Sequence, residues 1–86
     1  ISVKILYFAS AREITGIGSE VLECEDGMTS DKLFKKLLQK YPKLIPLSED
    51  LSIAVNQKYI DEDNDKPGVV LNNNDEFAII PPVSGG

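Results

Sequence analysis

One stretch of the chain has the spacing of an amphipathic helix, and the stretches on both sides of it have the composition of strands. Between residues 33 and 41, apolar side chains recur at helical intervals and lysines occupy the opposite side. The apolar positions are Leu33, Phe34, Leu37, Leu38 and Tyr41. Pro42 ends the helix, because the residue before a proline is pushed out of the helical region. A single helix of this kind must bury its apolar side against a sheet.

Three residues in front of the helix have the chemistry of a helix start. Thr29, Ser30 and Asp31 are predicted to supply a capping side chain and a negative charge near the helix N-terminus.

Five further segments are predicted to form strands, because β-branched and aromatic residues are frequent in them and several alternate with polar ones. The segments are residues 2–8, 20–25, 51–56, 58–60 and 77–80. The order strand, strand, helix, strand, short strand, strand predicts an α+β fold with a mixed sheet. One main helix packs across one face of that sheet. This arrangement is the β-grasp of ubiquitin.

The connections between these elements are predicted from their turn residues. Residues 9–19 are expected to form a loop, because Gly16 and Gly18 lie within them. Asn56 and Gln57 predict a tight turn between two strands. Residues 44–47 and 61–68 are expected to be surface loops.

Alternation along the strands predicts which side chains face the helix. Val3, Ile5 and Tyr7 share the inward side of the first strand, so Leu6 and Phe8 lie on the open face of the sheet. The inward residues of the second and last strands are Leu22, Cys24, Phe77 and Ile79. The outward ones are Val21, Ala78 and Ile80.

The composition excludes most catalytic and metal chemistry. The chain has 86 residues and no histidine, so it lacks the commonest general base and metal ligand. A domain of this size has little material for a deep active site. Cys24 is the only cysteine, which excludes an internal disulfide and argues against a zinc site. A small core residue is the favoured interpretation of Cys24, and a reactive thiol is the alternative. We expect no metal and no permanently bound cofactor.

Charge and hydropathy limit the partners and the location. The net charge is −5, and the lysines are spread along the chain, so we expect no nucleic-acid partner. No apolar run approaches the ~18 residues of a membrane span, so we expect no membrane association and a cytoplasmic location. The acidic residues of the 61–68 segment lack the spacing of a calcium loop, so a solvated loop is favoured over a calcium site.

The C-terminal sequence P-P-V-S-G-G has the properties of a tail that reaches away from a body formed by residues 1–80. The two prolines favour extended backbone, and the two terminal glycines fit a channel too narrow for other residues. Residues 81–86 can span up to roughly 20 Å. A frayed terminus is the alternative interpretation. A partner enzyme could adenylate the terminal carboxylate, and a sulfur nucleophile could then convert it into a thiocarboxylate.

Three blocks of sequence carry a resemblance to a known family. They are L-Y-F-A-S-A-R-E-I-T-G at residues 6–16, A-V-N-Q-K-Y-I at 54–60 and D-E-F-A-I-I-P-P-V-S-G-G at 75–86. Together they resemble the small subunits of molybdopterin synthase, which are sulfur carriers of molybdenum cofactor biosynthesis.

The resemblance implies a role for the end of the chain. Gly86 would become a glycyl adenylate and then a 1-thioglycine that donates sulfur to cyclic pyranopterin monophosphate, forming the dithiolene of molybdopterin. The residues that would thread into the partner are Pro81, Pro82, Val83, Ser84 and Gly85. The chain would be a non-catalytic sulfur-donor subunit rather than an enzyme on its own.

The resemblance also implies two partners. An adenylyltransferase related to ubiquitin-activating enzymes would consume ATP on Gly86, and two small subunits would flank a dimer of large subunits. Phe8, Tyr59 and Ile80 match an apolar docking patch of the family, with scattered exposed apolar residues as the alternative. Arg12 matches a family arginine that either contacts a partner or packs locally. The alternative functions are a protein modifier and a carrier for thiamine synthesis or tRNA thiolation.

Overall fold

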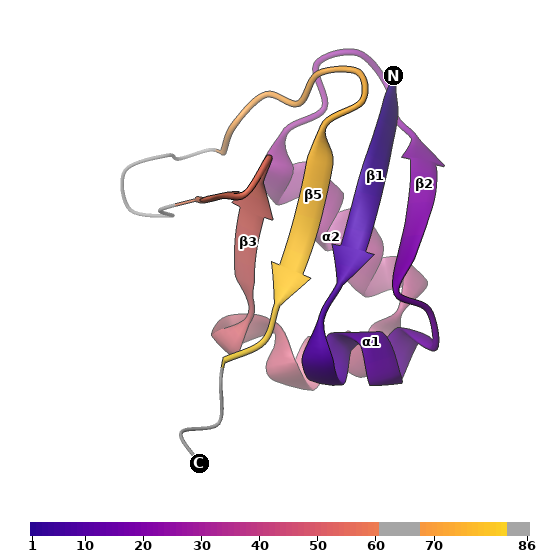
Figure 1. The fold of residues 1–86 in the computed structure, drawn as a ribbon, viewed down its shortest axis with the longest axis vertical. Coiled ribbons are helices and arrows are strands. Elements are labelled where there is room, and N and C mark those ends of the chain that lie inside the picture. The colour runs from indigo at the N-terminus through magenta and orange to yellow at the C-terminus, as the bar shows by residue number, and fades with distance from the viewer. Residues whose placement is uncertain (61–67, 83–86) are drawn as a thin grey trace.

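A five-stranded sheet with a helix across one face forms the body of the molecule (Figure 1). The computed structural model describes residues 1–60 and 68–82. The elements are β1 (Ser2–Tyr7), α1 (Ala9–Thr15), β2 (Ser19–Glu23), α2 (Ser30–Lys40), the 3-10 helix η1 (Pro42–Asp50), β3 (Ser52–Val55), β4 (Lys58–Tyr59) and β5 (Glu76–Ile80). The predicted ends of the strands, and the predicted C-terminal end of the main helix, agree with these bounds to within two residues.

The strand order in the sheet is β2-β1-β5-β3-β4. Strand β1 pairs with β5 in parallel, whereas its pairing with β2 and the pairings of β3 with β4 and β5 are antiparallel. The sheet is therefore mixed, and the N-terminal and C-terminal strands lie side by side at its centre. The predicted β-grasp fold is confirmed.

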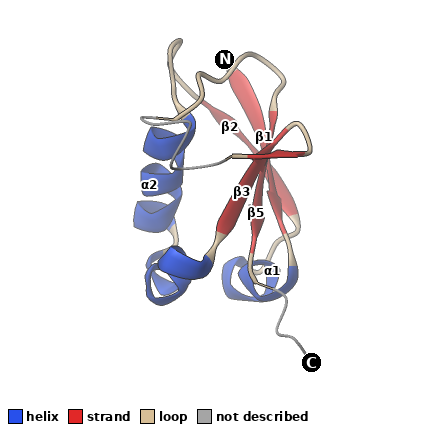
Figure 2. Cartoon of the chain, turned by 90° about the vertical axis from the view of Figure 1, so that its left-hand side faces the viewer, coloured by secondary structure: helices blue, strands red, loops and turns tan. Residues whose placement is uncertain are grey.

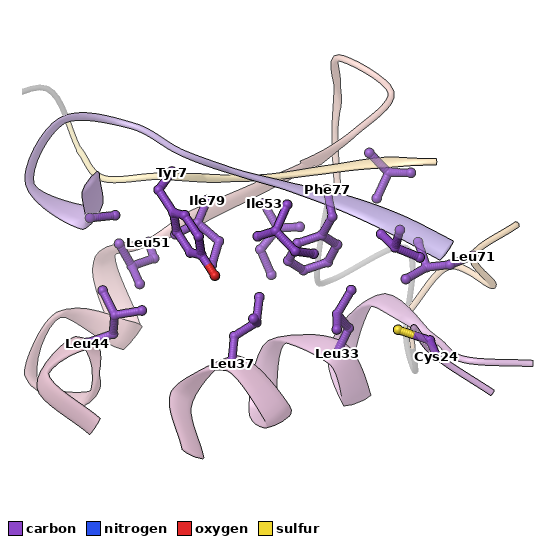
Figure 3. Packing of buried hydrophobic residues seen from close by; sticks show 14 residues of the cluster. Tyr7, Cys24, Leu33, Leu37, Leu44, Leu51, Ile53, Leu71, Phe77 and Ile79 are labelled. Atoms are coloured by element: carbon purple, nitrogen blue, oxygen red, sulfur yellow. The ribbon is translucent and has the colours of Figure 1, made fainter. Parts of the chain in front are cut away.

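The core lies between the sheet and α2. Leu33 and Leu37 of α2 point toward Phe77, Ile79 and the other inward side chains of the sheet (Figure 3). All four of these side chains are fully buried. Burial of a leucine side chain stabilises a fold by about 1.5–3 kcal/mol. The predicted inward face of the first strand and the core position of Cys24 are also confirmed.

Residues 9–19 contain a helix, so the prediction of a loop there was wrong. Helix α1 begins directly after β1 and ends at Gly16, whose positive φ of 81° closes the helix through a hydrogen bond to the Arg12 carbonyl. Alanine, arginine and glutamate favour helices, and Ala11 is fully buried. The glycine that suggested a loop is in fact a helix C-terminal residue.

The segment that follows α2 is also helical rather than a loop. Pro42 stands at the first position of η1, where its missing N–H costs nothing, and Leu44 is fully buried. Each turn of a 3-10 helix contains three residues, so the apolar spacing differs from that of an α-helix.

The start of α2 is held differently from the predicted capping arrangement. Thr29 is the residue before the helix, but its side chain donates to the Asp31 carboxylate instead of capping the backbone. The buried Ser30 hydroxyl accepts a hydrogen bond from the Val69 N–H at 2.9 Å. A side chain at Gly68 would meet both Ser30 and Asp31 at 2.7 Å, so this crossing requires glycine. Residues 68–71 therefore cross the N-terminus of α2 and hold it in place.

The predicted tight turn between the third and fourth strands is confirmed. Asn56 and Gln57 both have positive φ, at 52° and 70°. Two successive residues of this kind form the two-residue turn that suits the twist of a hairpin. The turn brings Tyr59 opposite Ala54.

Candidate functional site

One row of side chains crosses the face of the sheet that α2 leaves open. Leu6 of β1 pairs with Ala78 of β5, Ala78 pairs with Ala54 of β3, and Ala54 pairs with Tyr59 of β4. Directly paired residues share a face of a sheet, so these four side chains form a continuous apolar row. Figure 2 shows α2 on one side of the sheet and α1 at the lower end of the sheet.

A second row lies beside the first, toward the end of β5. Ile80 pairs with Ser52, and the Phe8 N–H donates to the carbonyl of Ile79, so Phe8 lies next to Ile80. Phe8 and Tyr59 have exposed fractions of 47% and 64%. Single exposed apolar side chains are common on protein surfaces, so the continuity of the two rows is what indicates a contact surface. The six apolar residues of the two rows are called the sheet patch here: Leu6, Phe8, Ala54, Tyr59, Ala78 and Ile80.

The centre of the sheet patch consists of two alanines. Ala54 and Ala78 are buried although they point away from the core, because larger neighbours surround their single methyl groups. The structure thus brings Phe8, Tyr59 and Ile80 onto one face. Alternation had placed Phe8 and Ile80 on the open face, and the family resemblance had added Tyr59. Alternation also placed Leu6 and Ala78 on the open face. The sequence did not identify them or Ala54 as part of this site, because only the strand register brings the three side chains into one row.

Phe8 also marks the start of α1. Its carbonyl accepts hydrogen bonds from the N–H groups of Ala11 and Arg12, so Arg12 lies one helical turn from Phe8. The Arg12 side chain is exposed and packs over Gly18, where a side chain would begin 3.5 Å from the arginine Nε atom. Arg12 is therefore near the sheet patch but covers the loop before β2.

The C-terminal residues continue from the edge of the sheet patch. Ile80 ends β5, Pro81 is buried and Pro82 is exposed. The predicted threading residues Val83, Ser84 and Gly85, and the predicted sulfur donor Gly86, lie outside the described residues.

A cluster of polar side chains at the end of β1 was not predicted from the sequence. The buried Tyr7 hydroxyl donates to Glu20 Oε2 at 2.6 Å, and the Tyr41 hydroxyl donates to the same oxygen at 2.6 Å. Lys40 Nζ donates to Glu20 Oε1 at 2.5 Å. The cluster joins β1, β2 and the end of α2. Because Tyr7 directly precedes Phe8, it also fixes the end of β1 that presents the patch.

The contacts of Glu20 change the proton affinity of each partner. Burial disfavours the Glu20 carboxylate, but hydrogen bonds from Lys40, Tyr41 and Tyr7 outweigh that effect and lower the pKa of Glu20. Burial, followed by the hydrogen bond to Glu20, raises the pKa of Tyr7. The cluster therefore consists of an ionised carboxylate that accepts from two neutral phenols.

Replacement of Glu20 by alanine is expected to lower the free energy of unfolding by about 2 kcal/mol, because the buried Tyr7 hydroxyl loses its acceptor. The ion pair adds little, since the Lys40 side chain is 45% exposed. Chemical denaturation at pH 7 measures the effect. Glu13→Ala is the matched control on an exposed glutamate and should stay within about 0.5 kcal/mol.

The same cluster predicts a pH dependence. The pKa of Glu20 is lower in the folded chain than its ordinary value of about 4.3. The ionised carboxylate therefore contributes its full stabilisation of the fold at pH values above the ordinary pKa. The contribution is lost as the pH falls through the folded pKa. The stability difference between the wild-type chain and Glu20→Gln should therefore be constant above about pH 5 and shrink below about pH 4. A difference that stays constant down to about pH 3 would contradict this assignment.

Among residues 1–60 and 68–82, no three acidic or cysteine side chains gather in a way that could hold a metal ion. No helix in this part of the chain is long and apolar enough to cross a membrane.

Fold, register and sheet patch together define a ubiquitin-like β-grasp protein whose C-terminal residues follow directly from an apolar sheet face. The ThiS family matches residues 5–86, and the chain belongs to this family. It is 45% identical to the molybdopterin synthase sulfur carrier subunit of Dictyostelium discoideum, covering 96% of this chain and 94% of that protein.

Two solved structures show the same fold. The putative molybdopterin converting factor subunit 1 from Pyrococcus furiosus superposes with a TM-score of 0.80 at 26% identity, covering 96% of this chain and 99% of that one. A second is the subunit 1 chain in the complex of subunits 1 and 2 of molybdopterin-converting factor from Helicobacter pylori. Its TM-score is 0.68 at 24% identity, and each chain is fully covered.

Proposed function

We propose that this chain is a sulfur carrier for molybdopterin synthesis and that its C-terminal carboxyl group, on Gly86, carries the sulfur. The observation that supports this most directly is the path of β5. This strand contributes Ala78 and Ile80 to the sheet patch and leads within a residue to the buried Pro81. A partner that covers the patch would therefore hold the C-terminal residues close to itself.

The chemistry requires two steps at the carboxyl group. A carboxylate is a poor electrophile, so an activating partner first transfers AMP from ATP to Gly86, which releases pyrophosphate and forms an acyl adenylate. A sulfide that attacks the carbonyl carbon displaces AMP and leaves a thiocarboxylate directly. A persulfide displaces AMP to form an acyl disulfide. A thiol then cleaves its S–S bond, which releases the thiocarboxylate and joins the thiol to the sulfur donor as a new disulfide. ATP is consumed by the activating partner and is not a resident cofactor of this chain.

The delivery step takes place on a second partner. The Helicobacter pylori protein of the same fold forms a complex with a second subunit, which supports a large subunit as the partner of this chain. In the proposed complex, two carriers flank a dimer of large subunits. The thiocarboxylate sulfur forms a bond to a carbon of cyclic pyranopterin monophosphate in the large subunit's active site, and water then hydrolyses the resulting thioester. Hydrolysis leaves the sulfur on the pterin for the dithiolene and restores the Gly86 carboxylate. Neither step needs a catalytic side chain of the carrier.

The mass of the intact chain tests this proposal. Co-expression with an activating enzyme of the ubiquitin-activating type should increase the mass by about 16 Da, because one carboxyl oxygen is replaced by sulfur. The thiocarboxylated chain should then form dithiolene product when mixed with a large subunit and the pterin precursor. A chain that keeps its original mass, or that instead becomes joined to lysines of other proteins, would contradict the sulfur-carrier function.

A further inference from the structure

Five lysines gather on the outer side of α2 and the residues just after it. They are Lys32, Lys35, Lys36, Lys40 and Lys43, and all are exposed. The chain has 9 basic and 14 acidic residues, so most of its positive charge lies on this one side of an acidic molecule. We call this set the lysine stripe. Leu33 and Leu37 turn the opposite side of α2 toward the sheet, so the stripe faces away from the sheet patch.

Folding accounts for only part of the stripe, because Lys40 lies in the last turn of α2, where the helix dipole favours a positive charge, and pairs with Glu20. Lys36 lies four residues from both Lys32 and Lys40, and like charges at this spacing destabilise a helix. Lys32 lies in the first turn, where the helix dipole disfavours a positive charge. Asp31 is the only acidic residue of α2, and the only ion pair of the stripe among the described residues joins Lys40 to Glu20. The helix therefore retains repulsion that a few substitutions to glutamate would remove.

We propose that the lysine stripe binds an acidic surface of a partner protein. Carboxylates of a partner would neutralise the repulsion between the lysines, and an ammonium group pairs with them without a fixed orientation. Because the stripe and the sheet patch lie on opposite sides of the molecule, the acidic partner binds while another protein covers the patch. This inference does not depend on the proposed sulfur chemistry, since the C-terminal residues take no part in it.

Two other classes of polyanion fit the stripe less well. Nucleic-acid binding uses arginine forks and exposed aromatic side chains, and α2 presents neither on its exposed side. The net charge of −5 also repels a long polyanion. Attachment to a lipid surface uses several apolar side chains beside the lysines. Those of α2 are buried or half-buried, which leaves Ile45 of η1 as a single exposed one next to the stripe.

The test uses the full chain, labelled with nitrogen-15, and a glutamate-rich peptide as the acidic probe. The peptide should shift the amide signals of residues 32–43, and its affinity should fall about fivefold between ~50 and ~200 mM salt. The double variant Lys35→Gln/Lys36→Gln should weaken binding about tenfold. The matched control Lys4→Gln/Lys58→Gln removes the same charge from exposed lysines outside the stripe and should leave the affinity within about twofold.

Several results would overturn the proposal. Equal losses in the two double variants would mean that the peptide responds only to net charge. Tighter binding of a short RNA duplex or of phosphatidylserine vesicles would assign the stripe to another class of partner. Shifts at residues 32–43 that depend on the concentration of the chain alone would identify a second copy as the occupant. Lys36→Glu is expected to raise the melting temperature by about 3 °C, because it removes the repulsion between neighbouring lysines. A fall in the melting temperature would show that this repulsion does not destabilise the helix.

Discussion

Deletion of Gly86 is expected to abolish sulfur transfer and to leave the free energy of unfolding within about 0.5 kcal/mol of the wild-type value. The shortened chain still ends in a glycine carboxylate, on Gly85, but that group reaches about 3.5 Å less far. A displacement of about 1 Å of a reacting group can already cost about a hundredfold in rate. The loss should therefore exceed a hundredfold even if Gly85 itself became thiocarboxylated.

The measurement is the yield of dithiolene product in a mixture of carrier, activating enzyme, large subunit, ATP, sulfur source and pterin precursor. Glu25→Ala is the control, because it changes an exposed side chain outside the sheet patch and keeps all of the C-terminal residues, and its yield should match the wild type. Chemical denaturation of each variant separates a loss of transfer from a loss of folding. Normal product formation by the shortened chain would show that Gly86 does not carry the sulfur.

The main helix and the sheet were predictable because their signals are long or repeated. Four apolar residues of α2 and Tyr41 directly after it recur over more than two turns, and a proline marks the end of the helix. The strands alternate strongly enough to identify the buried sides of β1 and β5. Once one helix and this strand order are established, few arrangements bury all of the apolar faces.

The two shorter helices were missed for a physical reason. Helix α1 has seven residues, so its apolar face repeats barely twice, and the nearby glycines outweighed that weak signal. Helix η1 contains two prolines, which usually indicate a loop, and one of them fits at its first position. In both cases tertiary burial, of Ala11 and of Leu44, stabilises a segment whose local sequence is ambiguous.

The sequence predicted only those parts of the candidate site that depend on alternation within a single strand. Alternation alone placed Phe8 and Ile80 on the open face. The central position of Ala78 depends on its pairing with both Leu6 and Ala54, and Leu6 is more than seventy residues away in the chain. The contacts of Glu20 likewise join separate elements. No local pattern encodes such long-range pairings, so the sequence could not predict them.

Replacement of Phe8 by aspartate is expected to weaken binding to the large subunit by about a hundredfold or more. Phe8 lies beside Ile80 at the point where β5 leads to Pro81, so it belongs to the part of the patch from which the chain continues toward its C-terminus. A carboxylate in a covered apolar contact must lose its water without gaining a partner. The free chain should stay folded, because Phe8 is already 47% exposed.

A matched variant distinguishes the sheet patch from the sheet face as a whole. Val21 is 63% exposed and lies on the same face, on β2, but it pairs with Lys4 and lies outside the patch. Val21→Asp should therefore leave the affinity, measured by calorimetry, within about threefold of the wild type. Equal losses in both variants would mean that the partner covers the sheet as far as β2. An unchanged affinity in Phe8→Asp would remove the patch from the interface, and the C-terminal residues would then have to hold the complex alone.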